Sequence, residues 1–184
     1  TKSLGDDKQT TIMTNIYKHK TAKDWIKVPF VYPATIPDLD GKYVILEVGP
    51  GRGDFLFHLA KTNPEAIVIG VEIKPKRVDK IIKRIERQNL KNILLIQDDA
   101  RDALPRFFNE FSIDEIHVNF PDPWPKKRHK KNRAVSLEFL NECRRILKSN
   151  RTLSFVTDHE TYANDVAEDI KQVKGFEKMI PENE

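Results

Sequence analysis

Short apolar runs alternate with amphipathic segments along most of the chain. Runs of aliphatic residues with few polar side chains predict strands buried on both faces, at residues 43–48, 67–71, 93–96, 115–120 and 152–156. Apolar residues at helical spacing predict helices between and after these strands, at residues 54–61, 75–87, 104–108, 136–147 and 161–173. A sixth strand is expected to begin at residues 176–180.

This alternation predicts an α/β fold with a doubly wound, mostly parallel sheet and helices on both faces. We assign this domain to residues 41–184. Residues 1–40 are polar and interrupted by prolines, and we expect an N-terminal arm there. We expect this arm to cover part of the sheet. The alternative is that it provides a second contact for a polyanion.

Composition adds a localised positive charge to this fold. The chain has 184 residues and a formal net charge of only +4. Residues 119–133 alone hold six Lys or Arg side chains against one acid, which indicates a nucleic-acid partner. No apolar run is long enough to span a membrane, and no segment resembles a signal peptide. The single cysteine, Cys143, is expected to be a buried structural thiol, and we expect a cytoplasmic protein.

Glycines and acids follow the predicted strands. Because parallel strands present their carboxyl ends at one edge, these residues are expected to share a ligand site. They are Gly49 to Gly53, Glu72, Asp99, Asp122 and Asp158. Turns favour Asp, so a single acid would mean little, but acids after so many strands favour a functional edge.

The glycine turn after the first strand fits either NAD or S-adenosylmethionine. The third glycine of the dinucleotide fingerprint is replaced by Asp54, and a carboxylate there would repel a pyrophosphate. Glu47 adds negative charge that suits a cationic sulfonium ligand, although a buried acid capping loop amides is the alternative. We expect Glu72 to accept hydrogen bonds from ribose hydroxyls, and Asp99 with Ala100 to lie at the adenine edge.

The segment after the fourth strand combines an acid, an indole and a basic run. Asp122 lies between two prolines and precedes Trp124, which is expected either to stack on a base or to pack the proline turn. Six cations follow, and we expect them to bind phosphates: Lys126, Lys127, Arg128, Lys130, Lys131 and Arg133. His129 could also contact phosphate, and because no other ligand stands at metal spacing around it, no metal site is expected.

Several segments, in this order and spacing, resemble the bacterial tRNA (guanine-N7-)-methyltransferases. The segments are Glu47–Gly53, Gly70–Ile73, Asp99–Ala100, Asn119–His129 and Thr157–Asp158. The resemblance implies a Rossmann-like class I methyltransferase that uses S-adenosylmethionine and methylates a guanine in the variable loop of tRNA.

The resemblance also implies roles for individual residues. By the resemblance, Glu47, Glu72, Asp99 and Asp122 contact the cofactor. From the glycine turn and the end of the third strand we add Gly49, Gly51 and Ala100 to the cofactor-binding residues. Asp122 is also the expected catalytic residue, and Lys126 and Asp158 are expected to bind tRNA. We add Lys127, Arg128 and His129 to the tRNA contacts because they belong to the basic run.

The sequence departs from this family near its end. Members continue into a Thr-x-Tyr-Glu-like motif and further strands, whereas this sequence stops at Glu184. We therefore expect the sheet to lack its antiparallel C-terminal strand. Another class I methyltransferase, acting on RNA, protein or a small molecule, is one alternative, and a non-catalytic RNA-binding subunit on the same scaffold is another. The basic run argues against a protein or small-molecule substrate, and the acids Glu47, Glu72 and Asp122 against the non-catalytic subunit.

Overall fold

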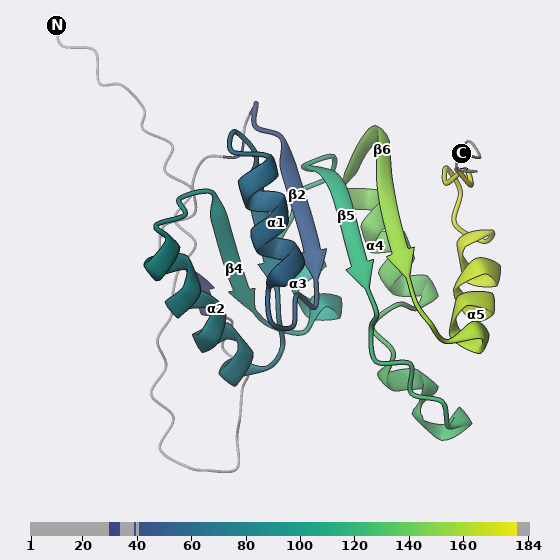
Figure 1. Ribbon diagram of the computed structural model, residues 1–184. Helices are drawn as coiled ribbons and strands as arrows, with labels where there is room; N and C mark the ends of the chain where they lie inside the picture. The colour runs from purple at the N-terminus through teal and green to yellow at the C-terminus, as the bar shows by residue number, and fades with distance from the viewer. Residues whose placement is uncertain (1–29, 34–38, 40, 180–184) are drawn as a thin grey trace, which may run out of the picture.

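The computed structural model describes residues 30–33, 39 and 41–179, and over these residues six strands form one sheet (Figure 1). The strands are β1 (Phe30–Tyr32), β2 (Val44–Val48), β3 (Ile67–Val71), β4 (Ile93–Gln97), β5 (Ile113–Asn119) and β6 (Leu147–Val156). The helices are α1 (Asp54–Thr62), α2 (Pro75–Gln88), α3 (Ala100–Phe107), α4 (Leu137–Ile146), α5 (Glu160–Ile170) and the 3-10 helix η1 (Lys127–Asn132).

The strand order is β1-β4-β3-β2-β5-β6. From β2 the chain adds β3 and β4 on one side and β5 and β6 on the other, so the order switches direction between β2 and β5. Strands β2 to β6 pair in parallel, and β1 pairs with β4 antiparallel. The predicted doubly wound, mostly parallel sheet is confirmed, and its switch point is where such folds bind ligands.

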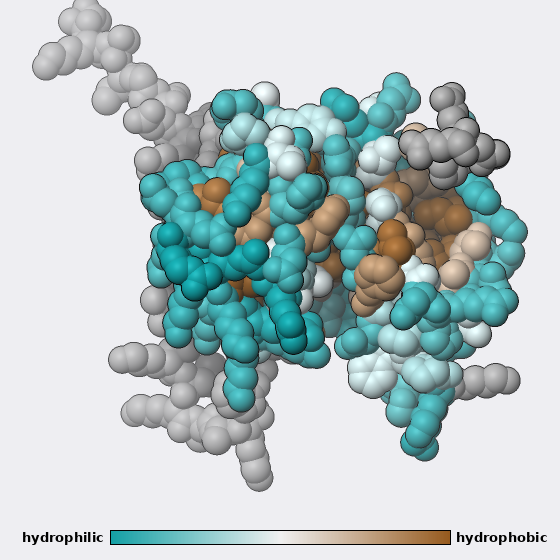
Figure 2. All heavy atoms as spheres, viewed as in Figure 1, coloured by the Kyte–Doolittle hydropathy of each residue, from teal (hydrophilic) through white to brown (hydrophobic). Residues whose placement is uncertain are grey.

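Helices cover both faces of the sheet. The core on one face includes Leu56 and Phe57 of α1 and Ile81 of α2, while the core on the other includes Leu104 of α3 and Phe139 of α4. Figure 1 shows α1 and α2 in front of the sheet, with α3 and α4 behind it. Figure 2 shows hydrophilic side chains over α1 and α2, and a group of hydrophobic ones near β6, which those helices do not cover.

Close packing and burial account for a glycine and a cysteine in this core. A Cβ on Gly70 of β3 would lie 3.1 Å from a methyl of Leu56 and 3.0 Å from one of Leu95, so glycine lets α1 and β4 pack closely there. Cys143 is fully buried, and burial raises the pKa of its thiol well above the usual range. The prediction of a buried structural cysteine is confirmed.

No helix in the described ranges is long and apolar enough to cross a membrane.

Several element boundaries differ from the prediction. Strand β6 begins at Leu147 rather than at residue 152, because Leu147 already pairs with Ile113 of β5, and the register then shifts so that Thr152 lies opposite Glu115. Helix α3 begins at Ala100, since Asp99 caps it. The sixth strand expected at 176–180 is wrong for residues 176–179, which are not in a strand, and Ile180 lies outside the described residues. Among residues 176–179, Phe176 packs against the core.

The described part of the predicted arm adds a strand to the sheet. Phe30–Tyr32 forms β1, in which Val31 lies opposite Ile96 of β4 and is buried. Its short length left no periodic signal in the sequence. The remaining arm residues lie almost wholly outside the described residues, and the domain boundary between residues 40 and 41 stays a prediction.

Candidate functional site

Parallel register brings the ends of the central strands to one level. Val48 lies opposite both Val71 of β3 and Val118 of β5, and Val71 lies opposite Ile96 of β4. Backbone hydrogen bonds continue just past the strands, since Gly49 N donates to Val71 O at 2.8 Å. The predicted edge residues therefore share one edge of the sheet. They follow β2 (Gly49, Gly51), β3 (Glu72), β4 (Asp99, Ala100), β5 (Asp122) and β6 (Asp158).

The turn after β2 requires its glycines. Gly49, Gly51 and Gly53 have φ values of +70°, +60° and +83°, in the left-handed region that L side chains rarely adopt. A Cβ on Gly53 would also lie 3.1 Å from the Phe57 ring. The absence of side chains at these glycines would let a ligand at the sheet edge approach the backbone closely. Helix α1 begins directly after the turn.

Glu72 fastens this turn to the next strand. Its side chain is buried, Oε2 accepts a hydrogen bond from Gly51 N at 3.1 Å, and Oε1 accepts one from Lys74 N at 2.8 Å. The Arg77 guanidinium lies 3.6 Å from Oε2. A carboxylate that caps loop amides was the alternative weighed for Glu47, and it is Glu72 that shows this arrangement.

Glu47 is a buried acid with unused hydrogen-bonding capacity. Its residue is 3% exposed, and within the described part of the chain its Oε2 has no hydrogen-bond partner. Its pKa is raised to about 7, chiefly by burial, against a hydrogen bond from the Asn119 side chain that lowers it, and with a smaller rise from the Glu72 carboxylate. Burying a charge without a partner is costly. A cation close to Glu47 would therefore stabilise the ionised carboxylate.

The acids after β4 are both engaged by arginines that the sequence pattern did not reveal. Asp98 accepts from Asp99 N at 2.8 Å and from Arg106 Nη1 at 2.7 Å, and burial raises the pKa of its carboxyl. Asp99 caps α3 through Arg101 N at 3.0 Å. It also accepts from Arg101 Nε at 3.0 Å and from Arg101 Nη2 at 2.6 Å.

In the loop after β5, Asp122 lies between two residues with a positive φ. Phe120 and Trp124 have φ values of +47° and +44°, which are costly for residues other than glycine and often found at functional sites. Asp122 is exposed. The Trp124 ring meets the His129 ring edge-on, with centroids 5.8 Å apart, and the residue stays 36% exposed.

Arg133 anchors this loop from beneath. It is 5% exposed, its Nε donates to Pro123 O at 2.7 Å, and its Nη1 contacts Asp165 of α5 at 2.6 Å. Its guanidinium lies 4.3 Å from the Tyr162 ring centroid. The predicted phosphate contact of Arg133 stays a prediction, and in the structure this side chain is buried and holds the loop. Lys130 also pairs with Asp165, at 2.7 Å.

The remaining cations lie on or beside η1. Lys126, Arg128 and Lys131 are exposed, and Arg128 Nε donates to His129 Nε2 at 3.1 Å. Nothing is described of the Lys127 side chain, so its predicted phosphate contact lies outside the described residues. Asp158 is exposed after β6.

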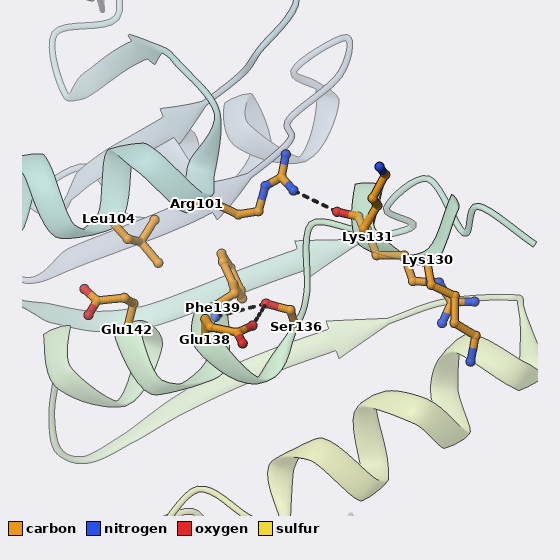
Figure 3. Close-up of a pocket in the computed structure, with 9 residues that line it drawn as sticks. Arg101, Leu104, Lys130, Lys131, Ser136, Glu138, Phe139 and Glu142 are labelled. Atoms are coloured by element: carbon orange, nitrogen blue, oxygen red, sulfur yellow. Dashed lines mark hydrogen bonds between the residues drawn. The ribbon is translucent and has the colours of Figure 1, made fainter. Parts of the chain in front are cut away.

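A cavity of about 390 Å³ lies beside this edge, between α3, η1 and α4 (Figure 3). It is lined by Arg101, Leu104, Lys130, Lys131, Arg133, Ser136, Glu138, Phe139 and Glu142. Within the ranges that the structure describes, no group of three His, Cys, Asp or Glu side chains could hold a metal ion.

Comparison with known proteins gives a consistent result. A family model described as "Putative methyltransferase" matches residues 41–184. The tRNA (guanine-N(7)-)-methyltransferase of Thermotoga maritima is 38% identical over 133 residues, which is 72% of this chain and 42% of that protein. The enzyme of the same name from Geobacter metallireducens is 37% identical over 135 residues, or 73% of this chain and 64% of that protein. The chain therefore spans less than two thirds of the length of these relatives.

A solved structure has the same architecture. The crystal structure of the aminoglycoside resistance methyltransferase NpmB1 aligns with a TM-score of 0.51 and 26% identity, covering 74% of this chain and 68% of that one.

The buried state of Glu47 predicts a specific dependence of stability on pH. The folded pKa of about 7 lies above the usual 4.5, so the folded state keeps its proton while the unfolded state loses it. The wild type should therefore lose stability as pH rises from 4.5 to 7. We expect Glu47→Gln to match the wild type near pH 4 and to exceed it above pH 7, by up to about 3 kcal/mol, in urea denaturation. Parallel pH profiles for the two proteins would contradict a raised pKa of Glu47 in the folded state.

Proposed function

The chain belongs to the methyltransferase family whose model covers residues 41–184, and from that premise we propose that it methylates tRNA. The proposed reaction transfers the methyl group of S-adenosylmethionine to N7 of a guanine in the variable loop, giving 7-methylguanosine. The names of the two curated relatives support this choice of substrate. The reducing environment expected from the single buried thiol is consistent with a cytoplasmic enzyme.

One observation carries the proposal. A buried carboxylate, Glu47, whose Oε2 has no hydrogen-bond partner among the described residues, lies at the same sheet edge as the strained Asp122 loop and the basic helix η1. The carboxylate suits a cationic ligand, and the basic helix suits a polyanion. An enzyme that brings S-adenosylmethionine to RNA needs both at one edge.

We assign the cofactor to the turn after β2. The close backbone at Gly49 and Gly51 would accommodate it, and Glu47 would face its positive charge. Glu72 has both carboxylate oxygens on loop amides, at 3.1 and 2.8 Å, and each oxygen retains a second acceptor position for a ribose hydroxyl. Asp99 and Ala100, at the start of α3, would border the adenine.

The chemistry of guanine N7 determines what the protein must do. N7 carries a lone pair and no proton, so no general base is needed. The lone pair forms the bond to the methyl carbon as the carbon–sulfur bond breaks and its electrons remain on sulfur. The residues must hold the three atoms in line, and they must offer negative charge where positive charge appears on the guanine ring.

Asp122 is the residue we assign to that second task. Its carboxylate would stabilise the guanine cation directly or orient the base through its N–H groups. The Arg133 contact with Pro123 O, at 2.7 Å, restrains the loop that carries it. The exposed cations Lys126 and Arg128, with His129 and Asp158, would hold the surrounding tRNA, and Lys127 belongs to the same proposed contact.

The test of this function is methyl transfer to unmodified tRNA by the wild type and by Asp122→Asn. With labelled S-adenosylmethionine, the wild type should produce 7-methylguanosine in the variable loop. Under single-turnover conditions with saturating substrates, the variant should transfer methyl about 10²-fold more slowly, the usual scale for losing one preorganised charge. A rate within about threefold of the wild type would remove Asp122 from catalysis. Binding of tRNA without any transfer would instead favour a non-catalytic RNA-binding subunit.

The salt dependence of tRNA binding tests whether an ion pair with Asp165 keeps a cation of the basic run from binding phosphate. Lys126 and Lys130 belong to the same basic run, but Lys130 is paired with Asp165 at 2.7 Å. We expect Lys126→Ala to lower the log–log slope of affinity against salt by about 0.7–0.9, the value for one phosphate contact. Lys130→Ala serves as the matched control and should change the slope much less. Equal effects of the two variants would contradict this division of the basic run.

A further inference from the structure

One guanidinium links the end of β4 to the basic helix η1. Arg101 Nε and Nη2 donate to the two carboxylate oxygens of Asp99, at 3.0 and 2.6 Å. Its remaining nitrogen, Nη1, donates to the carbonyl oxygen of Lys131 at 3.0 Å. Figure 3 shows Arg101 reaching from α3 to Lys131 at the top of the cavity. The link joins residues thirty positions apart.

Helix η1 depends on such polar links for its position. The helix projects from the body of the molecule beyond the end of β5 (Figure 1). The cavity of about 390 Å³ separates part of it from α3 and α4. Toward α5 it is held by the contact between Lys130 and Asp165, at 2.7 Å, and toward α3 by the bond between Arg101 and Lys131.

Arginine is suited to this double contact. Its planar fork binds a carboxylate through two parallel N–H donors and still has another donor aimed elsewhere. A lysine has a single charged centre and cannot reproduce both contacts in fixed geometry. The Asp99 side chain is 11% exposed and that of Arg101 is 42% exposed, so the pair is partly shielded from water.

We infer that Arg101 is a positioning residue that couples the cofactor site to the tRNA-binding helix. This inference rests on the proposed function, in which Asp99 borders the cofactor and η1 contacts tRNA. A cofactor seated over Asp99 removes its remaining contact with water, and the lower local dielectric strengthens its ion pair with Arg101. The stronger ion pair restricts the movement of the Arg101 side chain. Arg101 then holds the Lys131 carbonyl, and with it the backbone of η1, in one position.

The expected result is positive coupling between the two ligands. A bound cofactor product should tighten tRNA binding, and by linkage tRNA should tighten cofactor binding by the same factor. Because Arg101 is partly exposed, we expect a factor of about three to ten, around the lower end of the range for coupled sites.

The test measures the affinity of unmodified tRNA with and without saturating S-adenosylhomocysteine. In the wild type the ratio of the two dissociation constants should be about three to ten. In Arg101→Lys, which keeps the charge but not the fork, the ratio should fall to about one. The melting temperature of the variant should stay near that of the wild type, because the side chain is partly exposed.

Arg77→Lys is the matched control. Arg77 is similarly exposed, at 46%, and contacts Glu72 at the end of the adjacent strand, but it has no recorded contact with η1 in the described part of the chain. Its variant should change the affinity for S-adenosylhomocysteine and leave the ratio at the wild-type value. A wild-type ratio of about one, or an unchanged ratio in Arg101→Lys, would overturn the inference while leaving methyl transfer intact. Failure of the wild type to bind tRNA in either state would overturn the proposed function as well.

Discussion

The carboxylate of Glu47, held out of water at the end of the central strand, is the constraint around which the site is arranged. Parallel pairing with β3 and β5 fixes its backbone, and the residue is only 3% exposed. A pKa of about 7 shows the cost of ionising it there. A protein selected for stability alone would have an apolar residue at this position, so the acid indicates a ligand that repays the cost.

Residues at the ends of the neighbouring strands position the rest of the site. Glu72 satisfies its carboxylate on loop amides and thereby fixes the glycine turn, while Asp99 caps α3 and holds Arg101. Beyond β5, the buried Arg133 holds the loop that presents Asp122. Buried and paired side chains thus hold the turn and the loop, while Asp122 is exposed and Oε2 of Glu47 has no hydrogen-bond partner among the described residues.

Much of this arrangement could be predicted from the sequence. Apolar runs revealed the central strands, and alternation with helices gave their parallel order and their common edge. The methyltransferase family was predicted from motifs and is confirmed by the family match. Periodicity could not reveal β1, which has three residues, or the polar beginning of β6.

The sequence also could not show which cations were available. A run of Lys and Arg looks uniform in one dimension, but Arg133 is buried against Tyr162, while Lys126 remains exposed. These differences arise from contacts with α5, more than thirty residues away. Arg101 was missed for the same reason, since its two partners meet only when α3 and η1 come together in the fold.

The most direct measurement of the central claim is proton release when S-adenosylmethionine binds. At pH 6 the free protein should hold a proton on Glu47, because its pKa is about 7. A cationic ligand beside Glu47 should lower that pKa and release about one proton. Calorimetry in buffers of different ionisation enthalpy measures this number, and Glu47→Gln corrects for protons exchanged by the ligand itself. We expect about one more proton released by the wild type than by the variant. Equal release by the two proteins would contradict a cation-binding role for Glu47.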